Sequence, residues 1–438
     1  MLNNTTLSRL MHRHKTVFIA IIGLIFNLCF PLSSHALPFG IYEPRSLAMG
    51  GAGVAVATGE NAVFYNPAML ATYKKHKEDA DNESFTFPAI SVRGTRSLEV
   101  LAEQRDRNYQ AEITTSITNF NNDPSQQNAQ IAADNIGSLL SLVDKIANNP
   151  FLLDASASLA ISVPSKFQGG AFFLSHRAVG DGQFNVPASD KATLSAYQQE
   201  LNSLAQGNAP NYANTDLYDG TNLRDPTPGI TSSARARAVY IKELGVSLSR
   251  QIKLFGEDYA IGLSPKMLQV TTYEFHRTIN NNVEDSEGTE DDDWQVNFDL
   301  GLFKKISPNW QAGLTVKNLI EREYPTASGD HITFKPQWRA GVAYLSSSII
   351  YTLDMDLIPN DGVYSGNAAQ FVLAGIEIKH SFMRYRLGYR DTIAHKGPRE
   401  VGVFSAGLGF NFKPVYLDLA YSENHQQRAA SLMFGFNF

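Results

Sequence analysis

Nine charged residues in the last hundred positions are the first candidates for chemistry, because they interrupt segments that are otherwise apolar or small. They are Arg339, Asp354, Asp356, Glu377, Lys379, Arg384, Arg386, Arg390 and Asp418. Carboxylates and guanidinium groups can pair with one another, and an arginine can also bind a solute carboxylate through two parallel hydrogen bonds. Two hypotheses stay open: an interior lattice of ion pairs that holds a buried segment, or a path for polar or amphipathic solutes.

The elements that would position these side chains are β-strands. Apolar residues alternate with polar or small ones, as in Phe404–Phe412, and a period of two places them on opposite faces of a strand. The pattern predicts strands at 84–95, 151–163, 168–178, 233–250, 258–277, 293–305, 309–320, 331–346, 348–358, 367–380, 382–392, 399–412, 414–424 and 427–438. This even number, fourteen, is typical of an outer-membrane barrel. The predicted fold class is therefore all-β, a fourteen-stranded antiparallel transmembrane β-barrel over residues 84–438.

Two features favour a barrel in lipid over a soluble sandwich. Very short connections, such as 164–167 and 306–308, alternate with long ones, as short periplasmic turns and long external loops do. The chain also ends on one aromatic face that includes Phe438, which resembles the signal read by the barrel-assembly machinery. Since a charge facing lipid near the midplane costs roughly 2–4 kcal/mol, we expect the nine charged residues to point into the lumen.

The N-terminus predicts export. Arg9, Arg13 and Lys15 precede an apolar run, Val17–Phe30, which is short for a spanning helix, and Ser34-His35-Ala36 is typical of a cleavage site. Residues 1–36 are therefore predicted to be a signal peptide, with an uncleaved anchor as the alternative. The only cysteine, Cys29, lies within it, so the mature chain lacks disulfides and thiol chemistry.

Catalytic and metal-binding motifs are missing from the sequence. There is no G-x-S-x-G, H-E-x-x-H or P-loop, and the histidines do not have metal-ligand spacing, so we predict neither an enzyme nor a cofactor nor a metal site. An acidic stretch, Glu284–Asp293, lacks EF-hand spacing and is predicted to be a solvated external loop. Without the signal's three basic residues, the 37 Lys and Arg against 43 Asp and Glu leave a net charge of −9, which argues against nucleic-acid binding.

Residues 37–83 are predicted to form a plug followed by a charged linker, 72–83. The plug is nearly free of charge, and Gly50, Gly51 and Gly53 would let its backbone turn tightly against a wall. Asn66-Pro67 predicts a turn in which the asparagine bonds to its own backbone. Arg45 is the main charge of this segment, and we expect it to pair with a carboxylate of the lumen.

Two long loops, 96–150 and 179–232, are predicted to carry helices on the external side. In the first, Asp123 would cap a helix that begins at Pro124, and apolar residues at helical spacing run from Ala132 to Ile146. The second helix covers residues 191–206. Each apolar stripe either packs on the barrel rim or belongs to a lid that gathers ligand or faces a partner.

One proline lies inside a predicted wall strand. Pro265 cannot donate to the hydrogen-bond ladder, so it must lie at a bulge or a gap. It is either an ordinary bulge near the rim or a kink that opens the wall.

The segment from Pro38 to Ala71 resembles the N-terminus of a group of Gram-negative outer-membrane proteins. The shared residues are Arg45, Met49-Gly50-Gly51 and the run Phe64-Tyr65-Asn66-Pro67-Ala68. A second block, Glu243–Phe275, also resembles the conjugal-transfer protein TraF family, which is itself similar to the FadL long-chain fatty-acid channels. The resemblance implies a hatch inside a fourteen-stranded barrel, with hydrophobic ligands that enter from outside and leave sideways through the wall.

Two functions remain open. The first is a passive channel or binding protein for hydrophobic or amphipathic molecules, in the Gram-negative outer membrane after Sec export. The second is an envelope or conjugation accessory that acts through its external loops while its pore stays shut. In either case the expected partners are membrane lipid, lipopolysaccharide and, through the closing strand that ends at Phe438, the assembly machinery.

Overall fold

The computed structural model describes residues 37–59, 61–72, 84–103, 107–147, 150–278, 283–363, 368–396, 402–412 and 414–437. The predicted signal peptide, most of the predicted linker and Phe438 lie outside these residues. No helix in the described part of the chain is both long and apolar enough to cross a membrane.

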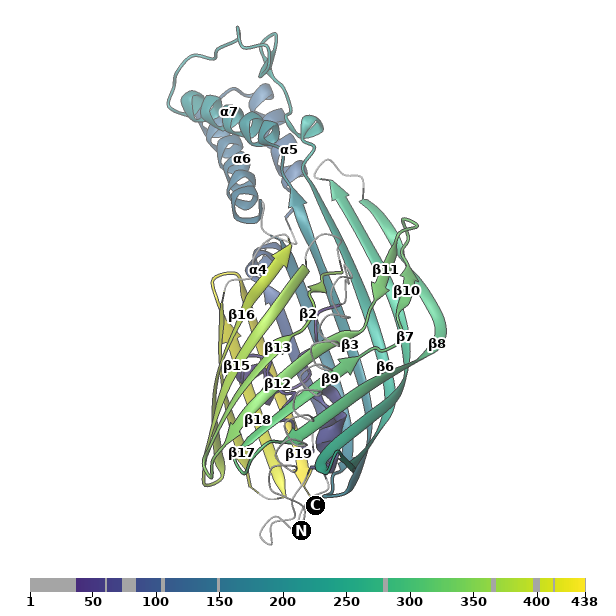
Figure 1. Ribbon diagram of the computed structural model, residues 1–438. Coiled ribbons are helices and arrows are strands. Elements are labelled where there is room, and N and C mark those ends of the chain that lie inside the picture. Colours follow the sequence, from purple (N-terminus) through teal and green to yellow (C-terminus); the bar gives the residue numbers. More distant parts are fainter. Residues whose placement is uncertain are drawn as a thin grey trace, which may run out of the picture. The chain divides into compact units, whose positions relative to one another are not determined.

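Fourteen antiparallel strands form a closed wall, which confirms the predicted fold class (Figure 1). They are β1 (Ser84–Thr95), β2 (Phe151–Val163), β3 (Gln168–Asn185), β6 (Ser233–Leu254), β7 (Glu257–Thr278), β8 (Val283–Lys305), β9 (Trp310–Lys317), β12 (Gln337–Leu345), β13 (Ile349–Asp356), β15 (Ala368–His380), β16 (Met383–Lys396), β17 (Val403–Asn411), β18 (Val415–Glu423) and β19 (Gln427–Asn437). The wall closes where β1 pairs with β19, with Ile90 opposite Leu432. A two-residue strand, β14 (Asn360–Asp361), extends the pairing of β15.

The largest errors in the predicted boundaries are three. β3 does not end at 178 but continues to Asn185. Residues 331–334 do not begin a wall strand; they form β11 (His331–Phe334), which pairs with β10 (Arg322–Pro325) in a separate hairpin. The acidic stretch predicted as a loop belongs to β8, which pairs with β7 from Val283 onward. The hairpin buries Tyr324, Ile332 and Phe334 on one face, so residues 331–334 alternate as a wall strand does and the pattern does not separate them from β12.

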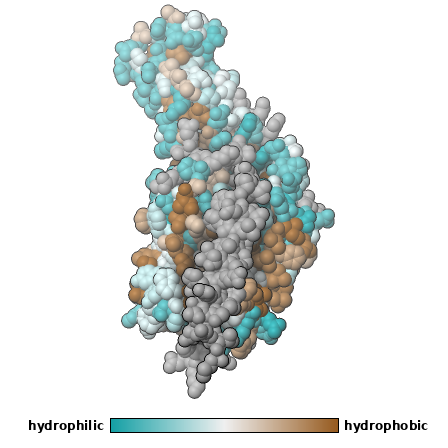
Figure 2. Space-filling view, in the orientation of Figure 1, coloured by the Kyte–Doolittle hydropathy of each residue, from teal (hydrophilic) through white to brown (hydrophobic). Residues whose placement is uncertain are grey.

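The two faces of the wall differ as a barrel in lipid requires. Exposed apolar side chains point outward from many strands, among them Ile90, Leu248, Leu353, Leu387 and Phe404. Figure 2 shows apolar surface over the barrel and mainly hydrophilic surface over the helical end. Residues of opposite parity, such as Asp354 and Arg386, are buried inside.

The plug lies within this wall. It contains α2 (Pro44–Ala48), α3 (Ala62–Tyr65) and a 3-10 helix, η1 (Pro67–Ala71), and every residue in 42–57 and 61–71 is buried. Gly50 and Gly51 have φ angles of 72° and 96°, a left-handed conformation that favours glycine. Glycines on the wall match them, since a Cβ at Gly388 would overlap the main-chain nitrogen of Gly50.

Three helices of the two long loops share one apolar core. They are α5 (Tyr109–Asn122), α6 (Gln126–Ile146) and α7 (Ala188–Ala205), followed by β4 (Tyr218–Asp219), β5 (Asn222–Leu223) and η2 (Thr227–Gly229). A fourth helix, α4 (Arg96–Glu103), contacts α6, β1 and β2. The predicted stripe on α6 is buried against α5 and α7. The predicted cap is wrong, because Ser125 caps α6 instead of Asp123, and α5 was not foreseen. Asp123 instead follows the last turn of α5 and ends that helix.

Candidate functional site

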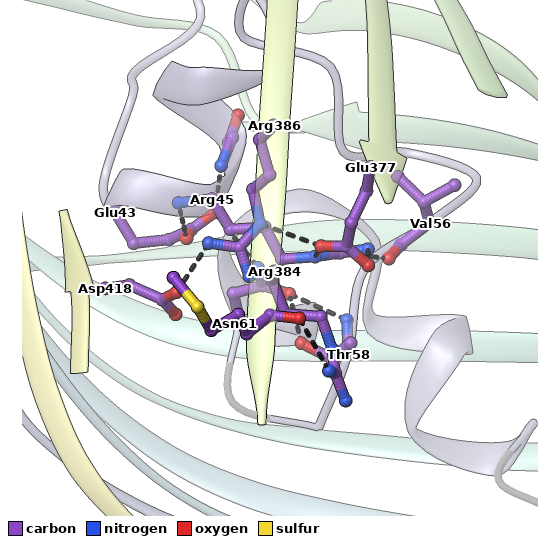
Figure 3. A network of polar contacts seen from close by, with 11 residues as sticks. Glu43, Arg45, Val56, Thr58, Asn61, Glu377, Arg384, Arg386 and Asp418 are labelled. Carbon is purple, nitrogen blue, oxygen red and sulfur yellow. Dashed lines mark hydrogen bonds and ion pairs between the residues drawn. The ribbon is translucent and has the colours of Figure 1, made fainter. Parts of the chain in front are cut away.

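An ion-pair network joins the plug to the wall (Figure 3). Arg45 lies in α2, and its Nε donates to Glu377 Oε2 on β15 at 2.8 Å. The same carboxylate oxygen accepts from Nε of Arg386 on β16 at 2.8 Å, and Arg386 also pairs with Asp418 on β18. Nη1 of Arg45 donates to the carbonyl oxygen of Val56 at 2.6 Å, so the arginine also ties two parts of the plug together. Glu377 is thus the lumen carboxylate that Arg45 contacts.

Glu43 begins the helix that carries Arg45. Its carboxylate accepts from the main-chain nitrogens of Arg45 (2.6 Å) and Ser46 (2.8 Å) and from Asn61 Nδ2 (3.0 Å). The carboxylate therefore satisfies donors at the start of α2 that the helix itself leaves unpaired. Burial raises the pKa of Glu43 to about 7, against the opposing effects of the Arg45 charge and the Ser46 N–H.

A second clamp holds the glycine-rich turn. Asp354 Oδ2 on β13 accepts from the main-chain nitrogens of Gly53 (2.7 Å) and Val54 (2.9 Å). Arg339 on β12 pairs with Asp356 at 2.6 Å, and its Nη1 donates to the carbonyl oxygen of Gly51 at 3.3 Å. The wall therefore recognises the main chain of this turn.

The Asn66-Pro67 turn links the plug to another wall strand, β8. Asn66 Oδ1 accepts from the main-chain nitrogen of Ala68, and its Nδ2 donates to the carbonyl oxygens of Val54 and, on β8, Leu302. Pro67 begins η1, where its missing N–H leaves no bond unmade. The predicted Asx turn is present, and it also fixes the plug against the wall.

A chamber of about 520 Å³ lies at the helical end of the barrel, with Pro38 of the plug in its lining. Its other lining groups are apolar, basic, acidic and neutral polar, and they include Val100, Phe151, Leu152 and Phe371, then Arg93, Arg96 and Lys145, then Asp181, and then Thr95, Ser97, Asn360 and Gln427. Arg93 pairs with Asp154, and Arg96 pairs with Glu423. Pockets that bind small molecules commonly have this size and this combination of apolar walls with a few polar groups.

Residues 63–356 match the protein family described as F plasmid transfer operon, TraF, protein. The chain belongs to this family. The wall of this TraF-family protein has the fold of the Ralstonia pickettii toluene transporter TbuX, with 12% identity, a TM-score of 0.50 and coverage of 91% of this chain and 99% of that one. The CymD monoaromatic hydrocarbon channel (10% identity, TM-score 0.47, 92% and 99% covered) and the Pseudomonas putida toluene transporter TodX (11%, 0.45, 92% and 100%) are also similar. No curated protein matches the chain in sequence.

The structure buries seven of the nine predicted lumen charges of this TraF-family chain. They are Arg339, Asp354, Asp356, Glu377, Arg386, Arg390 and Asp418. Lys379 and Arg384 are cross-strand partners two residues from Glu377 and Arg386, so they share the inward face by parity. They lie at the β15–β16 turn, where Lys379 is exposed and Arg384 half-buried. Arg384 donates to the carbonyl oxygens of Ser381 and Met383 there.

Sequence reasoning missed a second buried ionic group, on the strands nearest η1. Lys266 pairs with Glu243 at 3.0 Å and with Asp299 at 2.9 Å. Lys317 lies close by with its Nζ 4.6 Å from the ring centroid of Tyr42 in the plug. These charges have the parity of the inward face in their strands, so the parity argument made for the last hundred residues could have found them here.

Pro265 lies within β7, which continues on both sides of it. Pairing with β6 is recorded at Gly245↔Lys266 and again at Leu248↔Leu263, but not between them, and the register does not shift. On its other side Pro265 pairs with Phe298 of β8. The proline therefore leaves a gap in one ladder without a bulge, and its use as a lateral exit stays a prediction.

Among the described residues, no group of three or more His, Cys, Asp or Glu side chains is placed to hold a metal ion.

Proposed function

We propose that this TraF-family protein is an outer-membrane channel of a Gram-negative bacterium that admits amphipathic small molecules through the chamber above its plug. The cargo class is an apolar ring or chain that carries an acidic group. The observation that carries the proposal is the lining of the chamber, where Phe151 and Phe371 share one cavity with Arg93 and Arg96.

The apolar and the basic side chains of the lining support different parts of the proposed cargo. The aromatic and aliphatic side chains can cover an apolar body, which stabilises it by roughly 25 cal/mol per Å² removed from water. The described part of the lining holds three basic side chains, Arg93, Arg96 and Lys145, against one acidic side chain, Asp181, and this excess of positive charge favours a carboxylate over a neutral group. The similarity to the toluene transporter concerns the fold alone, so the cargo is argued from this lining.

The apolar outer belt and the alternation of short and long connections support residence in the outer membrane. The N-terminal segment supports Sec export, and the closing strand β19, with Leu432 and Phe434 exposed, supports recognition by the assembly machinery. Lipid and lipopolysaccharide would surround the wall.

The test is uptake of benzoate by proteoliposomes, with two adjacent residues of β2 as a matched pair. Leu152 lines the chamber, whereas Leu153 is 43% exposed on the outer face. Because an indole narrows the cavity, Leu152→Trp should reduce benzoate uptake several-fold, and Leu153→Trp should leave it unchanged. Glucose should not enter. Benzoate uptake equal to that of empty liposomes, or equal in both variants, would sink the proposal.

A second candidate is an envelope or conjugation accessory with a closed pore. The observation that favours it is the set of contacts that hold the plug, from Arg339 on β12, Asp354 on β13 and Glu377 on β15, among others. This candidate predicts that the full chain passes neither alkanes, fatty acids nor sugars, and that deletion of residues 37–71 opens the barrel. Liposome swelling with both proteins separates the two candidates.

A further inference from the structure

A trough of about 990 Å³ runs along the outer surface of the wall, on the strands whose inner face contacts η1. Two rows of outward side chains border it, and cross-strand pairing makes the members of each row neighbours. The rows are Leu248, Leu263 and Leu300, and Ile261, Leu302 and Leu314. The trough extends over seven adjacent strands, from Val163 on β2 to Trp338 on β12, and is apolar for most of its length.

The trough follows from glycines that face the plug. Gly262 and Gly301 are cross-strand partners between the two rows. A Cβ on either one would overlap η1, at the main chain of Ala68 for Gly262 and at the side chain of Asn66 for Gly301. The wall therefore approaches the plug more closely here than a wall with side chains could, and its outer surface is hollowed to match.

One end of the trough is cationic. Arg250 lines it, is exposed and has Gln168 and Ile261 as its cross-strand neighbours. It lies four residues before the end of β6 at a short turn, which is the periplasmic end of the wall by the loop pattern. Within the described part of the chain, Arg250 has no ion pair. Lys166 is exposed in the β2–β3 turn, and Phe167 of that turn accepts a bond from the nitrogen of Gln251 at 2.8 Å.

We infer that this trough is a binding site for one glycerophospholipid of the periplasmic leaflet. Its phosphate contacts Arg250, and one acyl chain lies between the two rows of aliphatic side chains. An arginine without a carboxylate partner at a headgroup depth complements a phosphate. From β6 to β12 the trough spans four strand spacings, about 19 Å, which suits an acyl chain. This site does not depend on the proposed uptake role.

The occupant is a lipid and not a cargo molecule in transit. The wall behind the trough is continuous with the plug, since Gly262 and Gly301 contact residues 66–68 directly. The side chains that close the ladder gap above it, Ser247 and Ser264, are fully buried and share a hydrogen bond of 2.6 Å. The ladder gap therefore offers no apolar path through the wall for an apolar solute.

The test is native mass spectrometry of the full-length mature protein, released from mild detergent with dioleoylphosphatidylglycerol added in steps. For the Arg250→Gln variant, the lipid concentration at which one molecule stays bound should be at least about tenfold higher than for the wild type. The control is Arg235→Gln, which removes an exposed arginine from the other end of the same strand, about 50 Å away. If Arg250→Gln retains the lipid as the wild type does, or if Arg250→Gln and Arg235→Gln lose it equally, the proposed lipid site is wrong.

A second pair of variants tests the acyl chain. Leu263→Trp fills the trough, and Leu419→Trp places the same side chain on an outward position of β18, where leucine is equally exposed at 41%. Only the first should release the lipid, and inorganic phosphate should not displace it. If Leu263→Trp lowers benzoate uptake while lipid retention stays unchanged, the trough serves the cargo and the inference is wrong.

Discussion

Replacing Arg45 by alanine should loosen the plug while leaving the wall intact. The substitution removes the bond to Glu377 at 2.8 Å and the bond to the Val56 carbonyl oxygen at 2.6 Å. Hydrogen bonds to charged groups contribute about 1.5–3 kcal/mol each. Breaking a buried pair costs about 3–5 kcal/mol when a charge is left alone. Glu377 keeps Arg386, so we expect a loss of about 3–4 kcal/mol in the free energy of plug opening.

The assay is amide hydrogen exchange in detergent, followed over residues 46–57. Because each 1.4 kcal/mol is a factor of ten, exchange of these amides should accelerate by about a hundredfold or more, while the amides of β15 and β16 change little. Arg428→Ala is the matched control, since its pairs with Glu423 and Glu99 are about 40% exposed and solvent-exposed pairs contribute little to stability. Plug exchange in Arg45→Ala within a few-fold of the wild type would refute the reasoning.

Two further predictions concern the plug. Gly388→Ala places a methyl group on the main-chain nitrogen of Gly50, so we expect a lower melting temperature and a plug that protease cleaves, whereas Gly229→Ala, whose methyl group would meet no atom within 4 Å, should leave the plug protected. If the plug of Gly388→Ala resists protease, the wall and plug can move apart at this contact without loss of stability, and the prediction is wrong. Glu43 has a pKa raised by burial to about 7 from an ordinary 4.5, so the folded plug keeps a proton that the unfolded chain loses. Its contribution to stability is complete below pH 4.5 and disappears as the pH rises through 7, a loss of about 3 kcal/mol. Melting at about pH 5 and about pH 8 should show this decrease, and a Glu43→Gln variant that keeps the same slope would assign it to another group.

The accuracy of the predicted strand bounds depended on whether lipid or water faces each strand. The bounds of β1 and β2 were predicted to the residue, because lipid on one side and a polar interior on the other impose a period of two. The extension of β8 and the β10–β11 hairpin lack that constraint, and both were missed. The alternation of apolar and polar residues therefore predicts the ends of a strand only where those ends lie within the membrane.

The candidate site was less predictable than the wall. Because charge is rare in the plug, the sequence predicted that Arg45 pairs with a carboxylate of the lumen. It could not predict which carboxylate, since Glu377 lies 332 positions further along the chain. That pairing depends on the height of the plug in the barrel, which no local pattern encodes. The chamber also escaped prediction, because Pro38, Phe151 and Phe371 come from distant segments that meet only after the wall closes.

The wall holds the plug mostly by its main chain, through the nitrogens of Gly53 and Val54 and the carbonyl oxygens of Gly51 and Ala55. Peptide groups are common to every residue, so this mode of recognition is indifferent to most side chains of the segment it grips. Across relatives, exchanges between side chains of similar size should therefore be tolerated in the plug, apart from Gly50 and Gly51, whose φ angles favour glycine. Selection should instead preserve the distant positions that reach the plug, Arg339, Asp354 and Gln311, together with the glycines that leave room for the contact.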